Sequence, residues 1–276
     1  MKHLLLVVMG LLYAATAFPF GVYIFADMEG CTGVTNSEQI SGGFGAARME
    51  EDINACVAAC FEAGATRVVV RDGHSSGRNV NPAHIDPRAE LIQGPTPGVR
   101  YQHLDGCEAI ILLGYHAMSL TPNAILAHSY SSRNTQAMYI NGREVGEIGI
   151  DALIATEHGV PVVLVIGADD ACREAEDWIP GVVTCQTKKS ITTQSGKCLS
   201  AKRSHARIAR KTKEAVAKRH SIPMIQPVYP STLRTELVPK GSVRVVFPEY
   251  VRDPNPRIRE KTGNNVEALL LGKPRK

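Results

Sequence analysis

The sequence predicts an α/β fold: a three-layer, mostly parallel sheet with flanking helices, plus a smaller α+β portion toward the C-terminus. Two observations predict this fold. Apolar runs of strand length lie at residues 22–26, 67–71 and 109–113, and a segment of helical periodicity at residues 47–63 separates the first two runs. Strands that alternate with helices favour βαβ units, in which the strands are parallel and the crossover is right-handed.

The first βαβ unit comprises residues 22–71. Its helix carries apolar side chains at helical spacing, and Gly64 stands where that helix would end. The strand at residues 109–113 extends the same sheet. Farther along, Asn141-Gly142 directly follows an apolar run, and this dipeptide predicts a tight antiparallel hairpin turn.

The pattern of helix and buried strand then continues. Residues 147–158 have one apolar face and predict a helix, and residues 161–166 predict another buried strand. Asp169 or Asp170 can cap the helix that follows, which we expect to continue to Pro180.

The pattern changes near residue 190. A basic helix at 200–219, a Pro-rich connector at 223–239 and a strand at 242–247 indicate a smaller α+β portion. We therefore expect a larger α/β domain at residues 18–190 and the smaller portion at residues 191–276.

The first seventeen residues resemble a secretory signal. A charged start precedes an apolar stretch and small residues, with cleavage expected before Phe18. The apolar stretch is too short to span a bilayer permanently, so we expect a secreted or periplasmic protein without stable membrane insertion after cleavage. A buried first strand or an uncleaved anchor is the alternative interpretation.

Composition excludes several classes of protein. With 276 residues, 44% hydrophobic and 21% charged, the chain is typical of a globular protein and not of a disordered or polytopic membrane protein. The net charge of +4 is concentrated at residues 188–219, without interleaved aromatic residues. This charge favours a solvated helix face over a nucleic-acid surface, and we expect no nucleic-acid partner. The seven cysteines are too sparse for a disulfide scaffold.

Potential metal ligands follow three of the predicted strands. Asp27 and Glu29 come after the first strand, one residue apart, so their side chains leave it on the same side. His74 and His116 come after the next two strands. Because open α/β sheets bind ligands at the carboxyl ends of their strands, these side chains predict a metal site.

Five short motifs around these residues occur in a distinctive order. They are Asp27-Met28-Glu29-Gly30, Asp72-Gly73-His74-Ser75, Gly114-Tyr115-His116-Ala117, Thr121-Pro122 with Ala127-His128-Ser129, and Tyr139-Ile140-Asn141-Gly142-Arg143 with Val145-Gly146-Glu147-Ile148-Gly149. Together they resemble the binuclear zinc D-aminopeptidases of the dipeptide-transport type (DppA-like), over roughly residues 22–200.

The resemblance implies two zinc ions per chain, bridged by one carboxylate. The implied ligands are Asp27 as the bridge, Glu29 and His74 for one ion, and His116 and Glu147 for the other. His128 matches the family's catalytic histidine. A ring-shaped homo-oligomer and short peptides with amino-terminal D-residues are also implied. The chain departs from the family pattern at Asn123-Ala124, at Cys31 and after Phe247, which affects substrate selection and assembly more than the ligands.

The chemistry fits these residue types, although each has a plainer interpretation. Zinc accepts imidazole nitrogen and carboxylate oxygen, and two ions that share a carboxylate can hold a water between them and polarise a scissile carbonyl. A lone Asp-x-Glu is usually a solvated turn, and a histidine such as His128, in a Pro-containing loop, is usually exposed. Asp72 can orient an imidazole or cap a turn. Cys31 is best interpreted as a small buried hydrophobe.

The sequence therefore predicts a zinc-dependent aminopeptidase that hydrolyses short peptides, with amino-terminal D-amino acids such as D-Ala expected from the resemblance. One alternative is an exported, non-catalytic metal-binding homologue with a binding or structural role. A second alternative is a nucleic-acid-binding module based on the charged segment 188–219.

Overall fold

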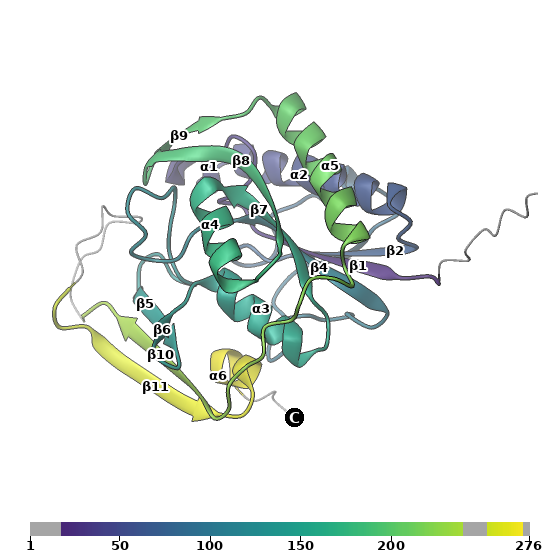
Figure 1. Ribbon diagram of the computed structural model, residues 1–276. Coiled ribbons are helices and arrows are strands. Elements are labelled where there is room, and N and C mark those ends of the chain that lie inside the picture. Colours follow the sequence, from purple (N-terminus) through teal and green to yellow (C-terminus); the bar gives the residue numbers. More distant parts are fainter. Residues whose placement is uncertain (1–17, 240–252, 273–276) are drawn as a thin grey trace, which may run out of the picture.

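The computed structural model describes residues 18–239 and 253–272. Its centre is a seven-stranded sheet in the order β3-β2-β1-β4-β7-β8-β9 (Figure 1). The strands are β1 (Gly21–Ala26), β2 (Arg67–Asp72), β3 (Glu90–Ile92), β4 (Cys107–Tyr115), β7 (Val162–Ala168), β8 (Val183–Thr192) and β9 (Ser195–Cys198). Neighbouring strands are parallel except for β8 and β9, so the predicted mostly parallel sheet is confirmed.

Helices cover this sheet. They are α1 (Ser37–Ser41), α2 (Gly43–Glu62), α3 (Glu147–Glu157), α4 (Asp169–Trp178) and α5 (Ala201–Ala217), and α6 (Val266–Leu271) lies near the C-terminus. Helix α2 packs against α5, and α3 packs against α4 (Figure 1). The chain winds from β1 to β2 in one direction and from β4 to β7 and β8 in the other. Right-handed crossovers therefore put α2 and α4 on opposite faces.

The winding direction reverses between β1 and β4, which are hydrogen-bonded neighbours. Both strands are apolar and almost completely buried, as Ile24 and Ile111 illustrate with no exposed surface. At such a reversal the connections leave in opposite directions and a crevice opens beyond the carboxyl ends of the strands. The fold thus provides a ligand crevice at the ends of β1 and β4.

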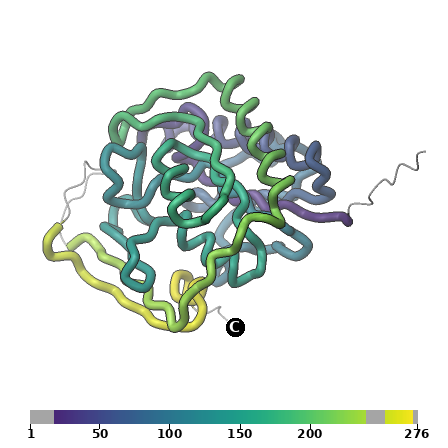
Figure 2. Tube along the Cα trace, viewed as in Figure 1, coloured from purple at the N-terminus to yellow at the C-terminus, as the bar shows by residue number. Residues whose placement is uncertain are grey.

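A second, antiparallel sheet has the order β11-β10-β5-β6. Its strands are β5 (Thr135–Ile140), β6 (Arg143–Glu144), β10 (Ser231–Leu237) and β11 (Arg257–Gly263). Asn141-Gly142 connects β5 to β6, which confirms the predicted hairpin. In Figure 2 the yellow C-terminal strand β11 runs beside green β10 at the edge of the molecule. On its other side β10 pairs with β5, which comes from much earlier in the sequence.

Two local expectations were wrong. The connector expected at residues 223–239 contains β10. Its prolines precede or follow the strand, so the backbone of residues 231–237 can form ladder hydrogen bonds with β5. The N-cap of α4 is Ala168, and Asp169 and Asp170 lie in the first turn, where their charge suits the positive end of the helix dipole.

Other expectations stay predictions. The signal at residues 1–17 and the strand at residues 242–247 lie outside the described residues. The domain boundary at residue 190 also stays a prediction; in space, α5 packs on α2 of the main sheet, and β5 belongs to the smaller sheet. Within residues 18–239 and 253–272, no helix combines the length and the apolar character needed to cross a membrane.

Candidate metal centre

The structure brings all six predicted side chains together at the carboxyl edge of the main sheet. Asp27 and Glu29 follow β1, His74 follows β2, and His116 is the first residue after β4. The other two come from outside the sheet: Glu147 is the first residue of α3, and His128 lies in the loop between β4 and β5.

Asp27, Glu29 and His74 form one group of candidate ligands, whose nearest donor atoms lie within 4.8 Å of one another. Nδ1 of His74 is 2.9 Å from Oδ1 of Asp27 and 3.0 Å from Oε2 of Glu29. The other oxygen of Asp27, Oδ2, faces away from this group and is 3.4 Å from Nε2 of His116. Asp27 therefore presents one oxygen to each side of the centre.

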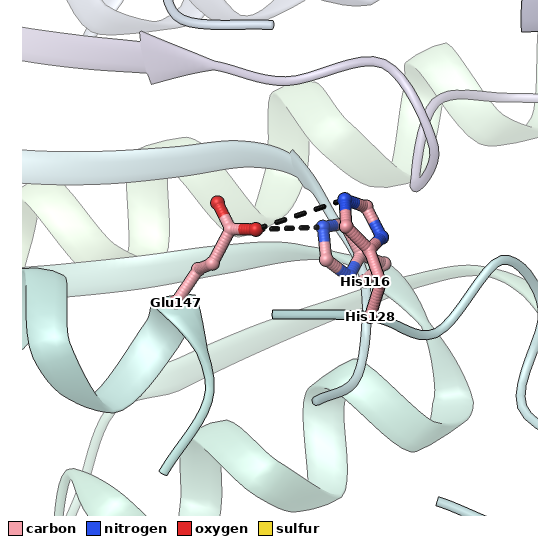
Figure 3. Close-up of side chains that lie close together, drawn as sticks. All are labelled: His116, His128 and Glu147. Atoms are coloured by element: carbon pink, nitrogen blue, oxygen red, sulfur yellow. Dashed lines mark ion pairs between the residues drawn. The ribbon is translucent and has the colours of Figure 1, made fainter. Parts of the chain in front are cut away.

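His116, His128 and Glu147 form a second group of the same size. Oε1 of Glu147 lies 3.5 Å from Nε2 of His116 and 3.8 Å from Nε2 of His128. Figure 3 shows both imidazoles directed at this single oxygen. The two rings are stacked, and their centroids lie 3.9 Å apart. The geometry brings His128 as close to Glu147 as a ligand would be, so its assignment to catalysis and not to metal binding stays a prediction.

Backbone hydrogen bonds fix the direction of two imidazoles. Nδ1 of His116 donates to the carbonyl oxygen of Ala117 at 3.0 Å, and Nδ1 of His128 donates to that of Leu126 at 2.9 Å. Nε2 of each ring is thereby turned toward Glu147. Metal-binding histidines are commonly oriented by such a hydrogen bond from the other ring nitrogen.

The turn that carries Asp27 and Glu29 is pressed against the end of β4. The backbone N–H of Asp27 donates to Leu113 at 2.7 Å, and a Cβ on Gly114 would lie 2.1 Å from the carbonyl oxygen of Asp27. Gly114 has a φ of +73°, a conformation that favours glycine. Cys31 is fully buried beside this turn, as expected, and its Sγ donates to the same carbonyl oxygen.

Lys188, on β8, forms hydrogen bonds with the turn that carries Asp27 and Glu29. Its Nζ donates to the carbonyl oxygens of Glu29 and Cys31, both at 2.7 Å, and its side chain is 1% exposed. Burial lowers the pKa of Lys188 to about 8. Sequence reasoning missed this lysine because it begins the basic segment 188–219, where a solvated side chain was the natural expectation.

Asp72 caps a turn. Its carboxylate accepts from the backbone N–H groups of Asn79 and Val80, at 2.5 and 3.1 Å, and from the side chain of Asn79. Of the two roles considered for Asp72, the structure supports the turn cap. The loop that carries His74 is therefore held at its far end as well as by β2.

The centre is buried and strongly coupled in charge. Burial alone would raise the pKa of Asp27, but hydrogen bonds and charge from His116 and His74 hold this pKa well below its usual value. Burial opposes protonation of His116, yet Asp27 and Glu147 raise its pKa well above normal. Burial and the neighbouring His116 lower the pKa of His128.

The donor set fits metal cations. Oε2 of Glu29 and Nε2 of His116 are buried, and their ion-pair contacts are with other members of the two groups: Glu29 with His74 at 3.0 Å, and His116 with Asp27 at 3.4 Å and Glu147 at 3.5 Å. Carboxylate oxygens and imidazole nitrogens are ligands that Zn²⁺ accepts, and cations would also offset the carboxylate charge. The residues present therefore fit a metal centre with two candidate sites.

A cavity of about 520 Å³ opens over the two groups. Its wall includes side chains from both groups, serines of α1, the segment 130–134 and Arg100. The volume falls within the roughly 300–1,000 Å³ typical of small-molecule sites. The arrangement can therefore hold a small substrate directly above the carboxylates and imidazoles.

The sequence matches the profile of the M55 peptidase family, described as D-aminopeptidase, over residues 20–252. The chain belongs to the M55 peptidase family. It is also similar to the D-aminopeptidase of Bacillus subtilis (strain 168), with 34% identity over 213 residues that cover 75% of this chain and 77% of the relative.

Among solved structures, the chain resembles the Zn-dependent D-aminopeptidase DppA from Bacillus subtilis, described as a self-compartmentalizing protease. The TM-score is 0.80 and the identity 27%, over 92% of this chain and 96% of the other. The predicted family, fold class and enzyme class are confirmed: this M55 protein is a hydrolase of the D-aminopeptidase type.

Sequence reasoning missed three further residues of this M55 site. Arg100 lies in the cavity wall and pairs with buried Asp151. Glu174, on α4, is also buried, and its Oε2 accepts from the backbone N–H of Met118 at 2.6 Å. Burial raises the pKa of Glu174 to about 7. No motif marks these positions, and they become visible only when distant segments meet.

Proposed function

We propose that the protein is a two-zinc aminopeptidase that removes the amino-terminal residue, D-alanine in particular, from short peptides. The observation that carries the proposal is the position of Asp27, whose two oxygens face His74 on one side and His116 on the other. A carboxylate in this position suits a bridge between two cations.

In this proposal Asp27 is shared, Glu29 and His74 complete one site, and His116 and Glu147 complete the other. The backbone N–H of Tyr130 donates to Oε1 of Glu147 at 2.8 Å and holds that carboxylate in place. When bound, two zinc ions would polarise the scissile carbonyl and activate a water molecule.

His128 is the proposed proton carrier. Its Nδ1 is engaged by Leu126, so Nε2 is the atom that reaches the substrate. A neutral imidazole can accept a proton at Nε2 and pass it to the leaving amine. The five other residues are the proposed zinc ligands, and His128 is the residue assigned to proton transfer.

The cavity favours peptides with a free amino terminus. Asp27, Glu29 and Glu147 lie at the floor of the cavity. Two Zn²⁺ ions held there would offset the carboxylate charge and could accept a neutral, unblocked terminal amine as a ligand. An acetylated terminus offers only an amide nitrogen, whose lone pair is delocalised into the carbonyl, and adds bulk at the floor of the cavity. Short, unblocked peptides are therefore the proposed substrates.

We also propose a ring-shaped homo-oligomer, because the similar Bacillus subtilis enzyme is described as self-compartmentalizing. Strand β11 is an edge strand of the smaller sheet, and its residues 257–262 are exposed. Natural proteins cover or charge such edges, and assembly is one way to cover them. Light scattering of the purified protein measures the number of chains.

A comparison of three dipeptides tests the proposed activity: D-Ala-D-Ala, L-Ala-L-Ala and N-acetyl-D-Ala-D-Ala. We expect the first to be cleaved fastest and the acetylated peptide to be nearly inert. Equal cleavage of the acetylated and free peptides would refute the aminopeptidase assignment, whereas equal rates for the D and L peptides would refute only the stereochemical preference. Zinc binding without cleavage of any peptide would favour the non-catalytic alternative.

A further inference from the structure

Arg100 is a cation in the wall of a mainly acidic cavity. It lies in the connection between β3 and β4 and lines the cavity together with Glu147 and Tyr130. The cavity wall has one other arginine, Arg133, which is exposed. The Arg100 side chain is only 15% exposed, so its charge is held in place at the cavity wall.

Asp151 fixes the guanidinium group of Arg100. Nε and Nη2 of Arg100 donate to the two oxygens of Asp151, both at 2.8 Å. Asp151 is fully buried and also accepts from the hydroxyl group of Tyr115 at 2.5 Å. A bidentate pair of this kind fixes the plane of the guanidinium as well as its position.

An aromatic ring packs against one face of the Arg100 guanidinium group. The guanidinium carbon lies 4.1 Å from the centroid of the Phe25 ring. A Cβ on Gly73 would lie 1.9 Å from this ring, so Phe25 occupies the space beneath the residue that precedes His74. Arg100 is therefore stacked on a ring that borders the first ligand group.

One edge of the guanidinium is unused. Arginine has five N–H donors, and Asp151 takes one from Nε and one from Nη2. Nη1 donates to no acceptor within the described residues, so the Nη1/Nη2 edge retains the two-donor geometry that matches a carboxylate. Arg100 lines the cavity, and this edge has the geometry to pair with the carboxylate of a bound substrate.

The spacing suits a short peptide. Asp151 lies four residues after Glu147 on α3, and side chains at this spacing are neighbours roughly 5–6 Å apart on a helix. In a dipeptide the free carboxylate lies one residue beyond the scissile bond, and each further residue adds at most about 3.3–3.6 Å. A carboxylate at Arg100 thus fits a dipeptide or tripeptide whose scissile bond lies near Glu147.

We propose that Arg100 binds the free carboxyl terminus of the substrate and thereby selects dipeptides and tripeptides over longer or amidated peptides. The proposal rests on the peptidase function proposed above, because it assigns the far end of the same substrate. Arg100 is then a specificity residue, held in position by Asp151 and Phe25.

Binding of a non-hydrolysable ligand tests the proposal without relying on turnover. The probe is D-alanyl-D-alanine with CH₂–NH in place of the peptide group, made with a free carboxylate and as the carboxamide. We expect calorimetry on the zinc-loaded protein to give about 10- to 100-fold tighter binding of the carboxylate form, as for charge-assisted hydrogen bonds. Equal affinities for the two forms would overturn the proposal.

Three variants complete the test. The double variant Arg100→Met/Asp151→Asn leaves no unpaired buried charge, and its carboxylate-to-carboxamide affinity ratio should fall close to one. Arg100→Lys retains the charge but not the two-donor edge, and should give an intermediate ratio. Arg143→Met removes an arginine that stacks on Trp178 away from the cavity, and should retain the wild-type ratio.

An unchanged ratio in the double variant would assign Arg100 a structural role only. The outcomes also separate the two proposals. A carboxylate preference in a protein that cleaves no free peptide would refute the peptidase function and leave the role of Arg100 intact. Cleavage of free peptides with equal affinity for the two probes would refute the role of Arg100 alone.

Discussion

Replacement of Glu174 by glutamine should stabilise the protein above neutral pH. Glu174 is 7% exposed, and one of its oxygens accepts from the backbone N–H of Met118. The other oxygen, Oε1, is buried without a hydrogen-bond partner in the described ranges. Glutamine has the same shape and retains the acceptor for Met118, but it carries no charge at any pH.

The pKa of Glu174 sets the magnitude. Burial raises it from 4.5 to about 7. At about 1.4 kcal/mol per pH unit, this difference of about 2.5 pH units corresponds to about 3 kcal/mol. Below pH 4.5 the carboxyl is protonated in both the folded and the unfolded protein. As the pH rises to 7 the unfolded chain ionises first, so wild-type stability falls by this amount, and the loss is complete above pH 7.

Urea denaturation at pH 5 and pH 8.5, with a chelator present, measures the effect. We compare the gain in the free energy of unfolding of Glu174→Gln over the wild type at the two pH values. This gain should be about 2–3 kcal/mol larger at pH 8.5 than at pH 5. Glu176→Gln changes an exposed carboxylate on the same helix and should show a much smaller difference. An equal difference between wild type and Glu174→Gln at both pH values would refute the reasoning.

Three further predictions concern the centre and the start of the chain. His128→Ala should retain its zinc and lose about 10²- to 10⁴-fold in kcat, as for removal of a general acid or base; loss of a zinc ion would identify His128 as a ligand. Lys188→Met should weaken zinc binding by about 10- to 100-fold in competition with a chelator, because Nζ no longer holds the turn at Glu29, and unchanged affinity would contradict this. Mass spectrometry of exported protein should give Phe18 as the first residue, and an intact Met1 would remove the prediction of export.

Local patterns predicted four of the seven strands of the main sheet and the proximity of four candidate ligands. Short apolar runs predicted β1, β2, β4 and β7, and the rule that ligands bind at the carboxyl ends of strands brought Asp27, Glu29, His74 and His116 to one edge. Glu147 and His128 were located by family motifs, because neither residue follows a strand.

The parts that were missed depend on contacts between distant segments. Strand β10 pairs with β5 almost one hundred residues away, and the prolines around it obscured the alternation. Arg100 becomes informative only when α3 brings Asp151 beside it. In the sequence, Lys188 cannot be distinguished from the solvated lysines that follow it. In the structure, β8 places its Nζ within hydrogen-bond distance of the carbonyl oxygen of Glu29. Burial of a charged side chain is a tertiary property, which composition and periodicity do not encode.

The zinc content of purified wild-type protein and of Asp27→Ala tests the central claim most directly. Asp27 presents one oxygen to each ligand group, so its removal should affect both metals. Elemental analysis should give two zinc ions per chain in the wild type and almost none in Asp27→Ala under the same dialysis. Two zinc ions per chain in the variant, or none in the zinc-supplemented wild type, would contradict the account.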